Sequence, residues 1–378
     1  MTNRMLSFLI FGLFWSLSVH SAGYRGGTER TGSYDVSGLK SPPAIGWTAS
    51  LGDSVRAGMV EQDGTLYVAA LDGEVTALSI EDGQIQWRYR TGYPILAALT
   101  LKDDLLMVAD SSGRLHRLNR LNGKVVWDQS VGAEVSSAPI IHGDLVWVGD
   151  LSGTLTALRI DDGKAVFTME LGGAIGADLA LFNNTLLLAA EKQLVALNMI
   201  SKKERWRINL DKPVAGGVTA SNQRVFVATL EGMLFAFDIA KGRPLWLRPL
   251  SSTVDVPVTV VGEQVFAAGN GGELQGFDVA NGKPVWVGVS GGAFTTATAS
   301  QDAIYVSSED GMVYAFASDS GEPLWEADLN TPLLAPPLPY EKGLLVANEV
   351  GEVIQLIPGG DDNGLGYRSP FVEARGEK

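Results

Sequence analysis

Five segments of closely similar form recur along the chain: ALSIEDGQIQW (77–87), ALRIDDGKAVF (157–167), AFDIAKGRPLW (236–246), GFDVANGKPVW (276–286) and AFASDSGEPLW (315–325). Their closing aromatics belong to a longer series that returns every 39 or 40 residues: Trp47, Trp87, Trp127, Phe167, Trp206, Trp246, Trp286 and Trp325. Repeats of about 40–45 residues with four strands each are typical of β-propellers. The spacing therefore predicts an all-β propeller.

Each repeat is predicted to contain four short strands separated by turns. In the first repeat we expect strands at 57–62, 65–70, 74–80 and 85–89, joined by Asp-Gly pairs. Such pairs between alternating apolar residues are a strong hairpin signal, because glycine accepts the positive φ that tight turns require. One repeat, 174–206, lacks two turn glycines, at Glu191 and at Lys203, and is expected to be the least regular.

The number of repeats predicts how the ring closes. Seven complete repeats end at Trp325, after which the chain supplies only three strands, near 334–338, 344–348 and 352–357. A single strand at 44–50, carrying Trp47, precedes the first repeat. Joining these pieces gives an eight-bladed propeller of four-stranded blades, closed by an N-terminal strand that completes the last blade. Such closure removes exposed sheet edges.

The two ends of the chain lie outside the repeats. Residues 1–22 combine Arg4, an apolar run at 6–19 and small residues at the end, which predicts a secretory signal peptide. We expect a lead-in at 23–43, the propeller at 44–357 and a polar tail at 358–378. No second long apolar run exists, so the mature protein is expected to be periplasmic or secreted, with no membrane span.

Composition narrows the chemistry. The chain has no cysteine, which excludes thiol nucleophiles, thiolate metal sites and a lipid on an N-terminal cysteine. Its formal charge of −14 disfavours binding to nucleic acid. Only three histidines are present, one of them in the signal region. We therefore expect no metal and no nucleic acid partner.

The repeated segments resemble the tryptophan-docking repeat of quinoprotein-like propellers, and the resemblance covers roughly residues 44–357. The lead-in YRGGTERTG (24–32) is similar to the segment that precedes the first blade in secreted members. Physically, each indole can pack between adjacent blades while its N–H reaches a backbone carbonyl. We expect the eight aromatics of the series to be structural.

The resemblance also raises an enzymatic interpretation. Quinoprotein alcohol dehydrogenases combine this propeller with pyrroloquinoline quinone, calcium, a catalytic aspartate and usually a vicinal cysteine pair. This chain has no cysteine and no long insertion between repeats. No paired carboxylates, serine–histidine set or phosphate-binding glycine loop accompanies its charged positions. The prediction is a protein without catalytic residues or cofactor.

The resemblance is closest to short secreted members that act as scaffolds in the assembly of outer-membrane proteins. It implies a protein partner, possibly the barrel-insertion complex, bound by the loops 210–217 and 249–257. The residues that it assigns to the contact are Lys212, Val214, Val254 and Asp255. We expect a monomeric scaffold.

The same register gives the positions that line the central channel. Those positions are mostly small and uncharged, and the exceptions are Arg56, Asp178 and Asp255. Either these charges face a wet channel, or they contact a ligand or partner. Two alternative functions stay open: a glycan or small-molecule site at the channel mouth, with Tyr93 and Phe294 as its aromatics, and, less favoured, a quinone-dependent dehydrogenase.

Overall fold

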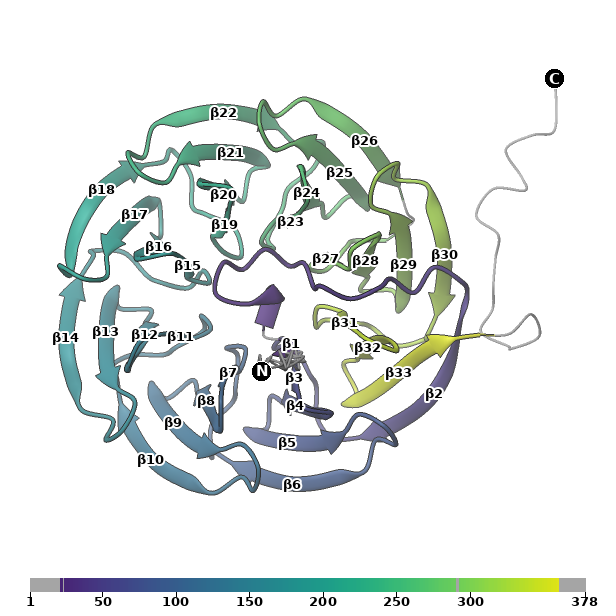
Figure 1. Ribbon diagram of the computed structural model, residues 1–378, viewed down its shortest axis with the longest axis horizontal. Coiled ribbons are helices and arrows are strands. Elements are labelled where there is room, and N and C mark those ends of the chain that lie inside the picture. The colour runs from purple at the N-terminus through teal and green to yellow at the C-terminus, as the bar shows by residue number, and fades with distance from the viewer. Residues whose placement is uncertain (1–20, 23, 290–291, 360–378) are drawn as a thin grey trace, which may run out of the picture.

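The computed structural model describes residues 21–22, 24–289 and 292–359, and eight β-sheets radiate from a common axis in this part of the chain (Figure 1). Seven sheets take their four blade strands from consecutive sequence, whereas the eighth has the order β2-β33-β32-β31. The N-terminal strand β2 thus completes the last blade, which confirms the predicted eight-bladed propeller and its closure. In the described residues, no helix has the length and apolar character needed to cross a bilayer.

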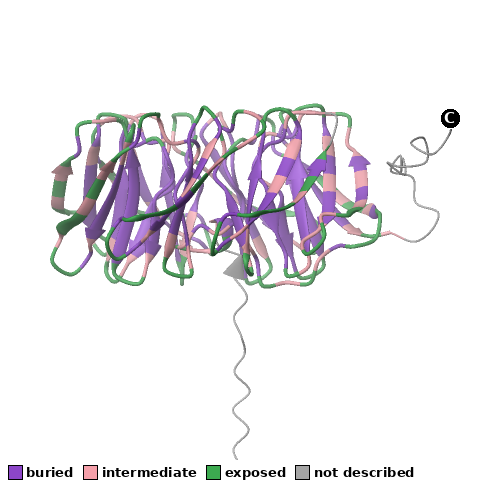
Figure 2. Cartoon of the chain, turned by 90° about the horizontal axis from the view of Figure 1, so that it is seen from above, coloured by how far each residue is buried: buried purple, intermediate pink, exposed green. Residues whose placement is uncertain are grey.

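All blades share one plan. Four antiparallel strands are arranged one after another from the axis outward, and together they span the thickness of the disc (Figure 2). The innermost strands are β3 (Val60–Gln62), β7 (Thr100–Lys102), β11 (Ile140–His142), β15 (Ala180–Phe182), β19 (Thr219–Ser221), β23 (Thr259–Val261), β27 (Thr298–Ala299) and β31 (Leu338–Tyr340). The second strands are β4 (Thr65–Ala69), β8 (Leu105–Ala109), β12 (Leu145–Gly149), β16 (Thr185–Ala190), β20 (Arg224–Ala228), β24 (Gln264–Ala268), β28 (Ala303–Ser307) and β32 (Gly343–Ala347).

The outer half of each blade follows the same order. The third strands are β5 (Glu74–Ser79), β9 (Arg114–Asn119), β13 (Thr154–Arg159), β17 (Gln193–Asn198), β21 (Met233–Asp238), β25 (Glu273–Asp278), β29 (Met312–Ala317) and β33 (Glu352–Pro358). The outermost strands are β6 (Ile85–Arg90), β10 (Val125–Ser130), β14 (Ala165–Glu170), β18 (Lys203–Asn209), β22 (Pro244–Pro249), β26 (Pro284–Val289), β30 (Pro323–Asp328) and β2 (Pro43–Ser50). A short strand β1 (Ser21–Ala22) pairs with β3, and a 3-10 helix η1 spans Tyr24–Gly26.

The innermost strands are shorter than the sequence predicts. The first begins at Val60 rather than at residue 57, and the last begins at Leu338 rather than at residue 334. The preceding backbone bonds to neighbouring turns instead of to the second strand: the Val55 amide donates to the carbonyl of Asn348, and the Ser54 carbonyl accepts from Leu71.

Each hydrophobic core lies between two blades. For example, Leu155 and Ala157 from the third blade pack with Leu186 and Leu188 from the fourth. An equivalent cluster joins the eighth blade to the first, so the ring closes through buried apolar contact as well as through β2. Adjacent blades are held mainly by apolar burial, which stabilises at roughly 25 cal/mol per Å².

The repeating tryptophan fixes how neighbouring blades dock. The Trp47 indole N–H donates to the carbonyl of Ile80 in the next blade at 3.0 Å. Its ring lies on the third turn of that blade, where a Cβ added to Gly83 would come within 2.7 Å of the indole. Gly83 also has a φ of +71°. The turn glycine is therefore required twice, by its backbone conformation and by the ring stacked on it.

This contact recurs around the ring, as the sequence predicts for structural aromatics. The indole N–H groups that donate to a carbonyl belong to Trp47, Trp87, Trp127, Trp206, Trp246 and Trp325. Trp286 packs in the same way on Gly321, although its buried N–H has no acceptor among the described residues. Trp325 has no third turn to meet in the interrupted eighth blade, and its N–H donates to Leu39 of the lead-in at 2.6 Å.

The irregular fourth blade explains the one phenylalanine of the series. The residue with positive φ in its third turn is Lys202 (φ 55°), so the predicted exception at Lys203 is wrong by one position. The Lys202 ammonium lies 5.8 Å from the centroid of the Phe167 ring. A phenyl ring covers less of the turn than an indole, which leaves room for a side chain. Phe167 in place of tryptophan and Lys202 in place of glycine therefore belong to the same contact between two blades.

We expect Gly242→Ala to destabilise the disc more than Gly172→Ala. A Cβ at Gly242 (φ +67°) would lie 2.7 Å from the Trp206 ring, whereas Gly172 (φ +80°) has open space around its Cβ. Left-handed backbone costs an L-residue about 1–2 kcal/mol at either site, and overpacking adds about 1–3 kcal/mol at Gly242 alone. Urea unfolding midpoints measure the difference, and equal midpoints would show that the indole does not constrain the turn.

Candidate functional site

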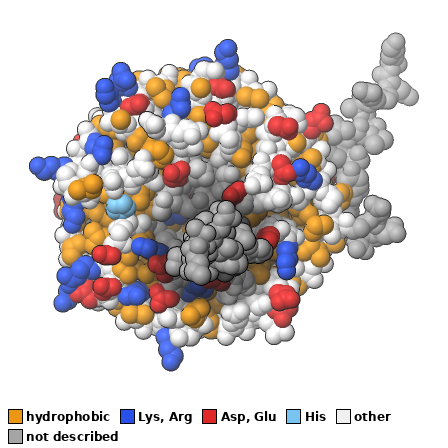
Figure 3. All heavy atoms as spheres, viewed as in Figure 1, with side chains coloured by type: hydrophobic (Ala, Val, Ile, Leu, Met, Phe, Trp, Pro, Cys, Tyr) orange, Lys and Arg blue, Asp and Glu red, His pale blue; other side chains and the backbone are white. Residues whose placement is uncertain are grey.

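The disc has two unlike faces. One face carries the loops that join each blade to the next together with the second-to-third-strand turns, and we call it the loop face. The opposite face carries the other turns and is crossed by residues 24–42, the lead-in (Figure 1). Positive and negative side chains are mixed over that lead-in face (Figure 3).

The two loops predicted to bind a partner lie side by side on the loop face. The loop at 210–217 leads into the fifth blade and the loop at 249–257 into the sixth. Gly216 packs so closely on Pro257 that a Cβ would overlap it, and the φ of Gly216 is +58°. Val214 is tied to both flanking blades, because its amide donates to Glu191 at 3.1 Å and it bridges to Thr229. The loops thus have a fixed backbone.

A pocket of about 220 Å³ opens beside the first of these loops. Its wall is formed mainly by residues with small side chains, and polar and apolar atoms line it about equally; these residues are Ala174, Gly176, Ala177, Ala189, Pro213 and Val214. Glu191 adds a carboxylate in the turn where seven other blades carry glycine. This volume is below the range of about 300–1,000 Å³ typical of small-molecule sites. It suits one or two side chains of a partner.

The four predicted contact residues are placed differently. Lys212 is exposed and forms an ion pair with Glu231 on the loop face. Asp255 is exposed, and Val214 is half-buried in the pocket wall. Val254 is 1% exposed and packs in the core between the fifth and sixth blades. A direct partner contact through the Val254 side chain is therefore wrong, because the alternation of the chain turns that residue inward.

The charges predicted in the channel separate into two groups. Arg56 and Asp255 are exposed on the loop face. Asp178 is buried instead: one carboxylate oxygen accepts from the Tyr24 hydroxyl at 2.7 Å, and the other accepts from the amide of Ala138 at 2.9 Å. Asp178 therefore anchors the lead-in from inside the channel.

The lead-in fills its end of the channel with residues that the sequence analysis did not single out. Arg25 and Arg30 are 0% and 3% exposed. Arg30 donates to the carbonyls of Tyr24 at 3.0 Å and Pro139 at 3.0 Å, while Arg25 donates to Val258. Burial lowers the pKa of both guanidinium groups. Burial, reinforced by the charge of Asp178, raises the pKa of Tyr24 well above its ordinary value.

Backbone hydrogen bonds fasten the lead-in to four consecutive blades. The donors occupy equivalent positions in β15, β19, β23 and β27. The bonds are Leu181 N to Thr28 O (2.7 Å), Ala220 N to Glu29 O (2.8 Å), Val260 N to Thr31 O (2.7 Å) and Ala299 N to Gly32 O (2.8 Å). The lead-in thus follows the inner rim of the ring and covers this mouth of the channel. The loop face carries no such covering segment among the described residues.

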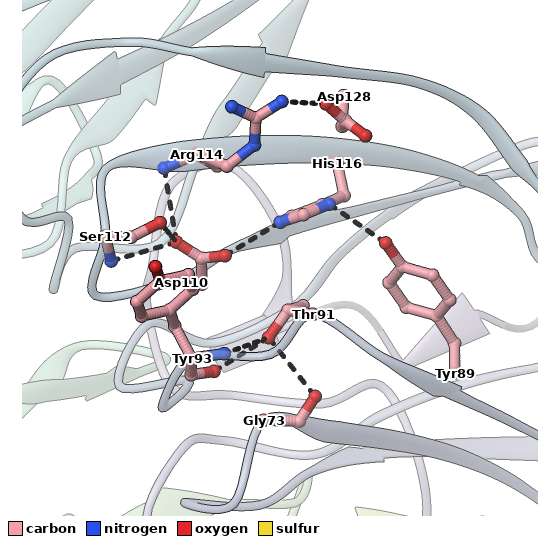
Figure 4. A network of polar contacts seen from close by, with 9 residues as sticks. All are labelled: Gly73, Tyr89, Thr91, Tyr93, Asp110, Ser112, Arg114, His116 and Asp128. Atoms are coloured by element: carbon pink, nitrogen blue, oxygen red, sulfur yellow. Dashed lines mark hydrogen bonds and ion pairs between the residues drawn. The ribbon is translucent and has the colours of Figure 1, made fainter.

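A histidine network joins the first two blades (Figure 4). The Tyr89 hydroxyl lies 3.0 Å from Nδ1 of His116, whose Nε2 lies 2.9 Å from a carboxylate oxygen of Asp110. The other oxygen of Asp110 accepts from Ser112 and Arg114 in the adjoining turn. Asp150 builds the same turn in the third blade. Because His116 and Asp110 are buried and the turn recurs, we interpret the network as a structural joint.

The two aromatics proposed for a ligand at the channel mouth do not lie together on the surface. Tyr93 is exposed, but Phe294 is 2% exposed and packs against Tyr314 in the core between the sixth and seventh blades. The expectation that Phe294 contacts a ligand is therefore wrong.

Eight four-stranded blades, docked by a tryptophan every 39 or 40 residues and closed by an N-terminal strand, define a quinoprotein-like β-propeller. The family model described as outer membrane protein assembly factor BamB matches residues 36–178, 163–297 and 287–358. The chain therefore belongs to the BamB family. No curated protein matches it in sequence.

Solved structures show the same fold at low identity. BamB from Moraxella catarrhalis is 19% identical, with a TM-score of 0.72 over 84% of this chain and 100% of that one. Quinohemoprotein alcohol dehydrogenase from Comamonas testosteroni is 15% identical, with a TM-score of 0.78 over 90% of this chain and 81% of that one. The computationally designed Ika8 protein is 14% identical, with a TM-score of 0.73 over 84% and 98%.

We expect Tyr24→Phe to destabilise the protein by about 1–3 kcal/mol, because it leaves the buried Asp178 carboxylate short of a donor. Tyr93→Phe, at an exposed tyrosine, is the matched control and should change little. The folded state raises the pKa of Tyr24, so its contribution is full below about pH 10 and is lost as the pH rises beyond that. Unfolding curves at pH 8 and above pH 10 test both points, and an unchanged midpoint at pH 8 would contradict the anchor.

Proposed function

We propose that this protein is a non-catalytic periplasmic scaffold that binds another protein through its loop face, in the assembly of outer-membrane proteins. The observation that carries the proposal is the pocket between the loops at 174–177 and 210–217, the second of which packs against the loop at 249–257. Membership of the BamB family supports the biological setting.

The chemistry of the pocket supports a protein partner. Its wall of alanine, glycine, proline and valine offers a small cradle, lined by both polar and apolar atoms, for a side chain of a partner, and Glu191 can pair with a nearby cation. Exposed Lys212 and Asp255 place both charge signs around this cradle. A central apolar anchor surrounded by polar groups is the usual form of an interface hot spot.

The residues present do not fit the metal that accompanies a quinone. Calcium takes six to eight oxygen ligands, with carboxylates prominent among them. In the described parts of the chain, no cluster of three or more Asp, Glu or His side chains is placed to share an ion. The fold shared with alcohol dehydrogenases therefore supports architecture alone.

The proposal predicts loss of binding from two substitutions on the loop face. Ala174→Trp would fill the pocket, and Asp255→Arg would reverse a charge beside it. Each should weaken binding to the purified periplasmic domains of the outer-membrane barrel-insertion protein by tenfold or more, measured by titration of the mature protein.

Two controls keep this experiment specific. Glu134→Trp places the same bulk at the equivalent position of the loop one blade earlier, and Asp82→Arg places the same charge on the lead-in face. Both should bind like the parent, with all variants checked for unchanged thermal unfolding. Equal losses in tests and controls, or parental affinity in all four, would contradict the proposed site.

A further inference from the structure

Two arginines of the lead-in are buried inside the ring, where the short helix η1 lies near its axis (Figure 1). Arg30 is fully engaged, because its Nε, Nη1 and Nη2 atoms each donate to a backbone carbonyl. Arg25 is engaged through Nη2 alone, which donates to the carbonyls of Val258 and Arg30. The two side chains thus differ in how many of their N–H groups are satisfied.

Two donor atoms of Arg25 are buried without an acceptor. Its Nε and Nη1 atoms have no hydrogen-bond partner among the described residues. A guanidinium group carries five N–H donors, accepts no hydrogen bond and stays charged at neutral pH. A charged donor that is buried without an acceptor carries the full penalty of losing its water. The arrangement therefore favours an acceptor from outside the chain.

The charges buried around Arg25 do not cancel. Asp178 is the carboxylate whose charge acts on both Arg25 and Arg30, and its two oxygens accept from a tyrosine hydroxyl and a backbone amide. Burial raises the pKa of Tyr24, and it raises the pKa of Tyr34 to about 12, so both are neutral at neutral pH. Two guanidinium groups and one carboxylate leave a net charge of +1. Buried charges are normally paired.

The channel wall adds no second carboxylate at the level of Asp178. The equivalent residue is glycine, alanine or proline in each of the other seven blades. Its neighbours on either side are Ala138, whose amide donates to the Asp178 carboxylate, and Gly217, which forms a β-bridge with Asp178. The side chains of the described wall at this level therefore leave the positive charge uncompensated.

The backbone holds both arginines in an unfavourable conformation. The φ angles of Arg25 and Arg30 are +51° and +56°, in the left-handed region. This region is costly for an L-residue with a Cβ, and such residues persist where their surroundings fix them. The lead-in is thus fixed with two guanidinium groups inside the ring.

We propose that Arg25 binds a small monovalent anion of the halide class inside the ring, with chloride as the natural ligand. The anion accepts from the free Nε–H or Nη1–H group and balances the net charge of the buried cluster. Phosphate and sulfate fit less well, because each brings a second negative charge and several oxygens that require donors. The site lies on the lead-in and is independent of the loop-face pocket.

Unfolding of the mature protein in sodium bromide, compared with sodium gluconate at equal ionic strength, tests the proposal. Binding to the folded state alone should raise the free energy of unfolding by about 1.4 kcal/mol for each tenfold increase in bromide above its dissociation constant. Arg25→Gln should remove this response. Arg205→Gln, which replaces an exposed arginine of β18, is the control and should keep it.

Three results of this experiment would overturn the proposal. They are no stabilisation by bromide, the same stabilisation in the parent and in Arg25→Gln, and a larger stabilisation by formate than by bromide.

A crystal of the parent protein grown in bromide gives a second measurement, which decides the matter if Arg25→Gln does not fold. Anomalous scattering should place one bromide within hydrogen-bond reach of Nε or Nη1 of Arg25. A water molecule at both atoms, or bromide bound at the outer surface alone, would contradict the proposed site.

Discussion

The stacking of one indole on one glycine turn is the contact on which the ring depends. A propeller blade buries its faces only against its neighbours, so the angle between blades must be nearly identical at every joint. The indole sets that angle by packing on a turn that cannot carry a Cβ, as at Trp206 and Gly242. Where the ring is the smaller Phe167, the turn accepts Lys202. The joint therefore tolerates change only when both partners change.

Closure of the ring makes the two faces of the disc different. The N-terminal segment first supplies Tyr24, Arg25 and Arg30 to the channel, then follows four innermost strands, and finally gives β2 to the last blade. This path covers one mouth of the channel and completes the interrupted eighth blade. The pocket lies on the loop face, and Glu191, which replaces a turn glycine, is part of its wall.

The sequence predicts the fold almost completely, because the fold depends on local periodicity. The tryptophan spacing, the turn glycines and the divided eighth blade all appear in the chain as patterns. Burial near the axis is less predictable. Val254 and Phe294 occupy equivalent positions in their repeats and pack in the cores between blades, whereas Asp178, three positions further along its own repeat, is held by an N-terminal tyrosine. The burial of Asp178 depends on Tyr24, which is more than a hundred residues away in the sequence. The burial of Val254 and Phe294 depends on the direction in which each side chain points.

Amide hydrogen exchange of the mature protein, with and without the periplasmic domains of the barrel-insertion protein, tests the account most directly. Binding at the loop face predicts slower exchange in the loops at 174–178, 210–217 and 249–257. The lead-in at 24–42 should exchange at the same rate in both states. Protection confined to the lead-in face, or no protection of the three loops at saturating partner, would contradict the assignment of function to the loop face.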